Sequence, residues 1–282
     1  FSSGNRDNLS AAQRHDDRLE VIEADIRDEA VTALVRDAAP EVLFHLAAQA
    51  DVRVSVDRPA FDAAVNVVGS LNVIEGARLG GARKVVFASS GGTIYGDPDP
   101  SALPVDESHA RHPVSPYGVA KMVVTDYLEA FRLLHGLDYT SLALANVYGP
   151  RQDPHGEAGV VAIFAGRLLE GEPCTVFGTG EQTRDFVYVD DVVDAFAKAA
   201  DAGSGQLFNI GTGQETSVNR LYEAMASAAG VDAPAERAPA RAGELDRSSL
   251  DRAKATAGLG WAPEVDLDDG VAHVLDWFRA RR

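Results

Sequence analysis

The stretch Lys84-Val-Val-Phe-Ala-Ser-Ser90 is a continuous apolar run that ends in small polar residues. An unbroken, β-branched run of this length is typical of a strand that is buried on both faces, as in a parallel sheet. We therefore expect residues 84–90 to form a central strand. Ser89 and Ser90 then stand at its end, where a hydroxyl could hold a substrate oxygen.

A second stretch, Tyr117-Gly-Val-Ala-Lys121, opens a predicted helix. Residues four apart on a helix share one face, so Tyr117 and Lys121 lie one turn from each other. A lysine in this position favours phenolate over phenol and pulls a tyrosine pKa, normally about 10, toward working pH. Together with a serine hydroxyl, this pair can take the proton from an alcohol hydroxyl while the carbon that carries the hydroxyl loses a hydride. A lone Tyr-x-x-x-Lys also occurs by chance on surface helices, so the surrounding sequence decides.

Outward from these stretches, predicted strands alternate with predicted helices. Strands are expected over residues 19–25, 41–48 and 139–146, and helices over about 31–39, 61–79 and 117–136. A loop rich in Gly, Pro and Asp is expected over residues 91–116. This alternation gives parallel β-α-β units, so the sequence predicts an α/β fold with a doubly wound, Rossmann-type sheet. After about residue 150 the alternation loosens, and the chain closes on an amphipathic helix that we expect Asp268-Asp269 to cap. We therefore expect a Rossmann domain over 1–150 and a smaller, irregular α/β substrate lobe over 151–282, with some chain crossing back to the sheet.

The composition excludes several classes of partner. The 282 residues carry 26 Lys and Arg against 43 Asp and Glu, a formal charge of −17, which argues against nucleic acid or an anionic membrane. No apolar run reaches 18 residues, so no membrane span is expected. Cys174 is the single cysteine, which excludes an intrachain disulfide and a cysteine metal site and fits a cytoplasmic location. We expect no metal, because Asp153-Pro-His155-Gly-Glu157 offers too few ligands.

Arginines in two motifs could meet an anionic ligand despite this charge. The motifs are Thr183-Arg-Asp-Phe-Val-Tyr-Val-Asp-Asp191 and Arg241-Ala-Gly-Glu244, and a third motif, Asn146-Val-Tyr-Gly-Pro-Arg151, offers the amide of Asn146. Guanidinium groups present forked donors that suit a diphosphate. Each arginine in isolation would more often be a solvated surface charge.

The order Ser-Tyr-Lys with these motifs resembles the extended short-chain dehydrogenase/reductase family, specifically its NAD-dependent sugar-nucleotide epimerases and dehydratases. The resemblance implies NAD as cofactor, a UDP-sugar as substrate and epimerisation at C4. Tyr117 would take the proton from the 4-hydroxyl, Lys121 would lower its pKa and hold the nicotinamide ribose, and Ser90 would bond the same oxygen. Hydride would pass from C4 to NAD and return to the other face of the sugar.

The resemblance also assigns binding residues. The cofactor set is Asp25, Ile26, Leu46, Ala47, Ala48, Asn66, Ser89, Tyr117 and Lys121. The substrate set is Ser90, Asn146, Arg184, Arg241, Glu244 and Ser248. Asp25-Ile26 would meet the adenine end of NAD, and Asn66 would steady the cofactor loop that contains residues 46–48. Ser248 would limit the size of the substituent accepted at the sugar C2, and its small side chain would leave room for an N-acetyl group. For His45 we favour a structural role at the strand's edge.

Two departures from the family pattern bear on the reaction. Many members place the active hydroxyl four residues before the Tyr-Gly pair, where this chain has Gly91. Counting from the strand, with one inserted residue, favours Ser90 and leaves Thr93 as the second candidate. Dehydratases carry an Asp-Glu pair just after this hydroxyl, and Gly-Gly-Thr stands there in this chain. Dehydration would therefore lack its acid and base.

Some alternatives stay open at this stage. They are another NAD-dependent sugar-nucleotide oxidoreductase or decarboxylase, or a catalytically silent scaffold. The resemblance implies a homodimer through helices that start near Phe61 and Tyr117. It also implies a glycine-rich β-α-β unit of roughly 30 residues before Phe1, which this sequence lacks. We thus expect an N-terminally truncated chain that binds NAD poorly and folds marginally.

Overall fold

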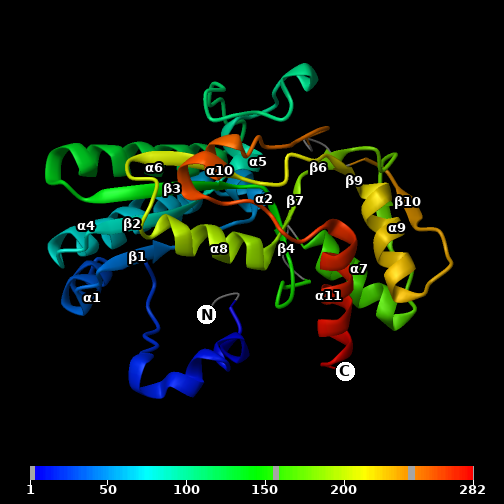
Figure 1. The fold of residues 1–282 in the computed structure, drawn as a ribbon, viewed down its shortest axis with the longest axis horizontal. Coiled ribbons are helices and arrows are strands. Elements are labelled where there is room, and N and C mark those ends of the chain that lie inside the picture. The colour runs from blue at the N-terminus through cyan, green and yellow to red at the C-terminus, as the bar shows by residue number, and fades with distance from the viewer. Residues whose placement is uncertain (1–3, 155–158, 241–244, 282) are drawn as a thin grey trace.

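The computed structural model describes residues 4–154, 159–240 and 245–281 (Figure 1). Its centre is a four-stranded sheet in the order β1-β2-β3-β8. These strands are β1 (Val42–His45), β2 (Lys84–Ser90), β3 (Asp138–Leu144) and β8 (Gln206–Ile210). Every neighbouring pair is parallel. The predicted parallel sheet is therefore confirmed.

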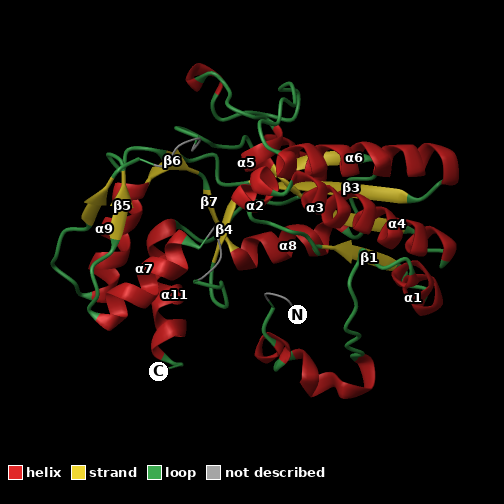
Figure 2. Ribbon diagram, turned by 180° about the vertical axis from the view of Figure 1, so that it is seen from behind, coloured by secondary structure: helices red, strands yellow, loops and turns green. Residues whose placement is uncertain are grey.

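Helices cover both faces of this sheet. They are α1 (Ala30–Ala38), α4 (Ser70–Leu79), α6 (Pro116–His135), α8 (Val189–Ala199) and α10 (Ala253–Leu259). Alternate residues of β2 point to opposite faces: Val85 and Phe87 pack with α1, α4 and α6, whereas Val86 and Ala88 pack with α8 and α10. Figures 1 and 2 show α6 and α8 on opposite sides of the sheet. The doubly wound arrangement is thus confirmed.

The predicted helix from Tyr117 forms as α6, and its ends have clear local causes. The side chain of Ser115 accepts a hydrogen bond from the backbone N–H of Gly118, and Pro116 occupies the first turn. Gly136 ends the helix with a left-handed φ of 72°. These caps place Tyr117 in the first turn, next to the carboxyl end of β2.

The predicted helix over 61–79 is also confirmed, but it is not uniform. It consists of α3 (Pro59–Ala63), a π-helical segment η3 (Ala64–Gly69) and α4. Single π turns occur often at functional sites. Asn66, from the predicted cofactor set, lies in this segment.

Three local predictions are wrong. Residues 19–25 form no strand, since alternation alone does not supply a neighbouring strand for their backbone groups. The strand predicted over 41–48 is only β1, and it is not buried throughout, because Phe44 is 47% exposed at the edge of the described sheet. The region predicted as a loop after Ser90 begins with a short helix, α5 (Gly91–Ile94).

The second half of the chain builds a separate apolar cluster beside the sheet. Its helices are α7 (Val160–Glu170), α9 (Val218–Ala229) and α11 (Leu267–Arg279). Its strand pairs are β4 (Asn146–Tyr148) with β7 (Phe186–Tyr188), β5 (Thr175–Phe177) with β10 (Glu236–Ala238), and β6 (Thr183–Arg184) with β9 (Thr216–Ser217). The cap of α11 is the side chain of Asp266, which accepts from the N–H of Asp269, so the predicted capping role of Asp268-Asp269 is wrong.

Short helical segments complete the described part of the chain. They are η1 (Arg6–Leu9), η2 (Ala12–Arg18), α2 (Val52–Asp57) and η4 (Pro100–Ala102). Figure 1 shows residues 4–29 running away from the sheet before the chain enters α1. Among the described residues, we find no helix with the length and apolar character that crossing a bilayer requires.

Candidate active site

Ser90, Tyr117 and Lys121 meet at the carboxyl end of β2. The hydroxyl of Ser90, the last residue of the strand, is hydrogen-bonded to the hydroxyl of Tyr117. The Nζ atom of Lys121 lies 5.6 Å from the centre of the Tyr117 ring. The three side chains that the sequence singled out are therefore neighbours.

The second candidate hydroxyl has a different environment. Thr93 Oγ1 lies in α5 and donates to the backbone carbonyl of Ser90 at 3.4 Å. The hydroxyl of Ser90, by contrast, contacts Tyr117 directly. The geometry thus favours Ser90 over Thr93 as the partner of the tyrosine.

The ionisation of this group differs from the sequence expectation. Lys121 is 4% exposed, and its Nζ donates to the carbonyl oxygen of Ala88 at 2.8 Å. Burial lowers the pKa of Lys121 to about 8, and the negative charge of Asp62 acts in the opposite direction. Burial also raises the pKa of Tyr117 to about 12, despite the hydrogen bond from Ser90. The pKa of Tyr117 is thus raised, where the sequence led us to expect a lowered one, because desolvation of the phenolate and the negative charge of Asp62 outweigh the hydrogen bond from Ser90.

The loop after β1 lies beside this group. Because His45 is paired with Phe87 in the parallel register, residues 46–48 continue at the same edge of the sheet as Ser89. Asn66 fixes this loop from η3: its Oδ1 accepts from the N–H of Gln49, and its Nδ2 donates to the carbonyl of Gln49, both at 2.8 Å. Leu46 is 57% exposed, so the loop presents an open strip.

These surroundings fit the nicotinamide half of NAD. The ammonium of Lys121 has three donors, of which the Ala88 carbonyl takes one, so it can also bond ribose hydroxyls. The strip at residues 46–48 carries small alanines that let a ligand approach the backbone.

Asp62 is a buried member of the site that sequence reasoning missed. It is 1% exposed, and its Oδ1 accepts from Gln49 Nε2 at 3.0 Å and from Asn66 Nδ2 at 2.8 Å. Its Oδ2 has no hydrogen-bond partner within the described part of the chain. The available signal was its spacing of four residues from Asn66 on one helical face.

His45 is tied to the same helix. Its Nε2 lies 2.8 Å from Ser70 Oγ, which itself donates to the carbonyl of Asn66 at 2.6 Å. Because that hydroxyl uses its proton on Asn66, His45 Nε2 must be the donor in the first bond. The ring also stacks on Phe87, with centroids 5.6 Å apart. This geometry supports the structural interpretation of His45.

Replacing His45 with glutamine is expected to weaken the acid sensitivity of folding. Burial lowers the pKa of His45 from 6.5 to about 3, so the folded chain binds fewer protons than the unfolded chain between these values. The neutral His45 therefore contributes to the free energy of unfolding in full above pH 6.5. This contribution falls by about 1.4 kcal/mol for each pH unit between pH 6.5 and pH 3. Glutamine keeps an N–H for Ser70 but does not titrate.

Urea denaturation near pH 7.5 and near pH 5.5 measures this effect. The loss of stability between the two conditions should be smaller in His45→Gln by about 1 kcal/mol. Equal losses in the two proteins would contradict a neutral, buried His45.

Asp25 pairs with its neighbour Arg27, and Ile26 contacts η3 and α4. Asp25 lies at the surface, where hydrogen bonds from the Arg27 guanidinium lower the pKa of its carboxyl to about 2. Ile26 packs against Gly69 so closely that a Cβ there would lie 2.7 Å from its Cγ1. The Ile26 carbonyl accepts from Asn72 Nδ2 at 2.9 Å.

The predicted substrate residues flank the segment after Ser90. A Cβ on Gly92 would lie 3.9 Å from Asn146 Oδ1, so that amide faces this segment. Ser248 is two residues before Leu250, whose Cδ1 would lie 2.3 Å from a Cβ on Gly91. Arg184 lies in β6, and its Nη1 donates to the carbonyl of Thr183 at 2.7 Å. The predicted residues Arg241 and Glu244 lie outside the described residues.

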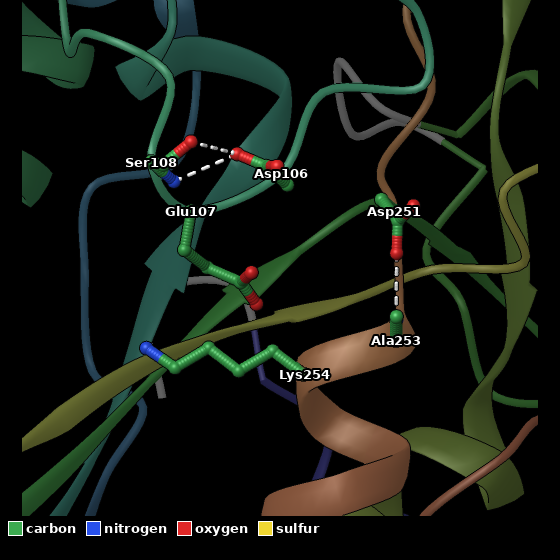
Figure 3. A pocket seen from close by; sticks show the side chains of 6 residues that line it. All are labelled: Asp106, Glu107, Ser108, Asp251, Ala253 and Lys254. Atoms are coloured by element: carbon green, nitrogen blue, oxygen red, sulfur yellow. Dashed lines mark hydrogen bonds between the residues drawn. The ribbon is translucent and has the colours of Figure 1, made fainter.

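A cavity of about 480 Å³ lies elsewhere, between the 103–115 loop and α10 (Figure 3). It is lined by Asp106, Glu107, Ser108, Asp251, Ala253 and Lys254. Its charged groups are used within the protein: Glu107 accepts from the N–H of Asn209 at 2.7 Å, and Lys254 donates to the carbonyl of Leu207 at 2.8 Å. The cavity contains none of the predicted site residues.

Comparisons with known proteins agree with this geometry. Residues 3–211 match the model of the NAD dependent epimerase/dehydratase family. A UDP-glucose 4-epimerase of Mycolicibacterium smegmatis is 51% identical over 280 residues, which cover 99% of this chain and 88% of the relative.

Two solved structures are also similar. The UDP-glucose 4-epimerase of Thermotoga maritima with UDP-glucose superposes with a TM-score of 0.94 at 45% identity, covering 100% of this chain and 89% of that one. The Thermus thermophilus UDP-glucose 4-epimerase in complex with NAD gives a TM-score of 0.91 at 39% identity, with coverages of 100% and 90%.

Proposed function

The chain belongs to the NAD dependent epimerase/dehydratase family, and from this premise we propose that it interconverts UDP-glucose and UDP-galactose at C4 with NAD as cofactor. The observation that carries the proposal is the cluster of Ser90, Tyr117 and Lys121 at the carboxyl end of β2. A tyrosine and a serine hydroxyl that bond each other can both reach one oxygen of a bound sugar.

Each member of the cluster has a distinct task. Tyr117 takes the proton of the 4-hydroxyl and later returns it, while Ser90 donates to the same oxygen. Lys121 holds the ribose next to the nicotinamide and supplies positive charge near the phenol. When bound, NAD accepts and returns the hydride, and its oxidised ring adds the positive charge that favours the Tyr117 phenolate.

Binding residues follow the same assignment. We propose that NAD is held by Asp25, Ile26, Leu46, Ala47, Ala48, Asn66 and Ser89. We propose that the UDP-sugar is held by Asn146, Arg184, Arg241, Glu244 and Ser248. The division into an NAD-binding domain over 1–150 and a nucleotide-sugar lobe over 151–282 belongs to this proposal.

Epimerisation is favoured over dehydration by the residues that follow Ser90. Elimination of water needs an acid and a base near the sugar, and α5 offers only Gly91, Gly92, Thr93 and Ile94. A silent scaffold is disfavoured, because the Ser90–Tyr117 hydrogen bond has no evident structural need.

We also propose a cytosolic homodimer. Its support is the exposed apolar surface on the helices that the family resemblance implicates, including Val68 on η3 and Val119 and Tyr127 on α6. The buried, free thiol of Cys174 is compatible with a reducing compartment.

The direct test starts from each sugar nucleotide separately. The purified chain with NAD is incubated with UDP-galactose or UDP-glucose, and both sugars are followed by chromatography. We expect the same equilibrium mixture from either side. Binding of NAD and of the UDP-sugar without interconversion would instead support another sugar-nucleotide oxidoreductase.

Replacing Ser90 with alanine is expected to lower kcat by about tenfold to a hundredfold, since one hydrogen bond to the reacting oxygen is lost. Thr93→Val is the matched control, because Thr93 bonds only the Ser90 carbonyl, and its kcat should stay within about twofold. Steady-state kinetics of the two variants decide between the hydroxyls. A larger loss in Thr93→Val would reverse the assignment.

A further inference from the structure

Asp185 forms a buried junction between three segments of the chain. It lies between β6 and β7 and is 1% exposed. Its Oδ1 accepts from the N–H of Thr212 at 2.8 Å and from Thr212 Oγ1 at 2.6 Å. Its Oδ2 accepts from the N–H groups of Gly213 at 3.0 Å and Leu250 at 3.2 Å. Both oxygens of the carboxylate are therefore acceptors for two donors each.

The segments joined here carry residues assigned to the UDP-sugar. Asp185 directly follows Arg184, and its backbone carbonyl accepts from the N–H of Asn146 at 2.9 Å. Leu250 follows Ser248 by two residues. One residue thus links three proposed substrate contacts that are far apart in the sequence: its backbone carbonyl holds Asn146, its carboxylate holds the segment after Ser248, and Arg184 precedes it directly.

Close packing extends this junction to the catalytic segment. A Cβ on Gly211 would lie 2.5 Å from Asp185 Oδ2, so the 211–213 turn rests directly on the carboxylate. Leu250, 1% exposed, leaves no room for a Cβ on Gly91, which is the neighbour of Ser90. A shift of Leu250 would therefore move atoms beside the reacting hydroxyl.

We propose that Asp185 is a positioning residue for the UDP-sugar, acting through Asn146, Arg184 and Ser248 rather than by contact with the ligand. This inference rests on the proposed function. It extends that function by separating the alignment of the nucleotide-sugar from the chemistry at Tyr117.

Asparagine at this position would disrupt the junction in either orientation. The amide has one acceptor oxygen and one NH₂ group, which is a donor only. An NH₂ in place of Oδ2 faces the N–H groups of Gly213 and Leu250, and both lose their acceptor. An NH₂ in place of Oδ1 faces the N–H of Thr212, which loses its acceptor, whereas the Thr212 hydroxyl can rotate to accept. The turn at 212–213 or the segment at Leu250 must then move.

Calorimetric titration of UDP into the full chain, together with steady-state kinetics, tests this role. In Asp185→Asn the dissociation constant of UDP should rise about tenfold to a hundredfold, as expected for lost hydrogen bonds to a charged group. KM for the UDP-sugar should rise in parallel and by a larger factor than kcat falls, while NAD affinity changes by less than about threefold. An unchanged UDP affinity would overturn the proposal.

Asp191→Asn is the matched control. Asp191 is also buried, and its two oxygens accept from the N–H groups of Glu264 and Val265, away from the three substrate segments. This variant should lose thermal stability but keep the UDP affinity of the unaltered chain. An equal loss of UDP affinity in both variants would reduce Asp185 to a general structural role and refute the proposal.

A gentler variant covers the case in which Asp185→Asn does not fold. Thr212→Val removes one donor to Oδ1 and keeps the shape of the side chain. We expect UDP affinity to fall about threefold, and no change would again overturn the inference. If the UDP affinity falls in Asp185→Asn as expected but the unaltered chain does not interconvert the sugars, only the proposed function fails.

Discussion

Replacing Tyr117 with phenylalanine is expected to lower kcat about a thousandfold while the fold and NAD binding persist. Proton transfer by a positioned group accelerates an enzymatic reaction about 10²–10⁴-fold. Among the described residues near Ser90, only Tyr117 is assigned to accept the proton of the sugar 4-hydroxyl. Phenylalanine keeps the ring over which Lys121 lies and removes only the hydroxyl. The measurement is the rate of UDP-galactose conversion at saturating substrate.

Tyr95→Phe provides the control for this experiment. Tyr95 is also buried, and its hydroxyl donates to Asn209 Oδ1 at 2.7 Å, outside the cluster. Its loss should reduce stability by about 1 kcal/mol and leave kcat within a few-fold. If Tyr117→Phe retained a tenth of the activity, another base would have to carry the reaction.

Replacing Trp261 with alanine is expected to cost about 3–5 kcal/mol of the free energy of unfolding. The side chain is 0% exposed and packs in the cluster between the sheet and α8. Its Nε1 donates to the carbonyl of Asp191 at 2.7 Å, so the substitution leaves a cavity and also removes a buried hydrogen bond. Such a loss is a large part of the 5–15 kcal/mol typical of a folded domain.

Urea denaturation followed by circular dichroism measures this cost. The other tryptophan, Trp277 on α11, is partly exposed and contacts Phe278 and Arg281, so Trp277→Ala should cost only about 1 kcal/mol. Trp261→Phe should recover much of the loss. Similar midpoints for the two alanine variants would show that Trp261 does not anchor α8 to the sheet.

The elements that were predicted correctly are those whose local signals agree with their surroundings. The 84–90 run is apolar on both faces because helices cover both faces, and Ser115, Pro116 and Gly136 set the ends of α6 locally. Residues 19–25 show a strand pattern, but pairing depends on a neighbouring strand that alternation cannot reveal.

The candidate site divides in the same way. The cluster of Ser90, Tyr117 and Lys121 could be predicted from spacing and resemblance, because each lies at the end of a well-marked element. The junction at Asp185 could not be, since its donor Leu250 is 65 residues away along the chain. The pKa of Tyr117 was misjudged because sequence spacing shows the neighbouring charge but not the depth of burial.

The loop at residues 46–48 is anchored at both ends by one asparagine. The carbonyl of Asn66 is joined through Ser70 to His45, and its side-chain amide binds both backbone groups of Gln49. Fixing the backbone of a residue costs about 1–2 kcal/mol in conformational entropy, so ordering these residues amounts to about 3–6 kcal/mol. This entropy is lost when the chain folds and not when a ligand arrives. The affinity of the loop for its ligand therefore depends on hydrogen bonds that η3 makes within the protein before the ligand binds.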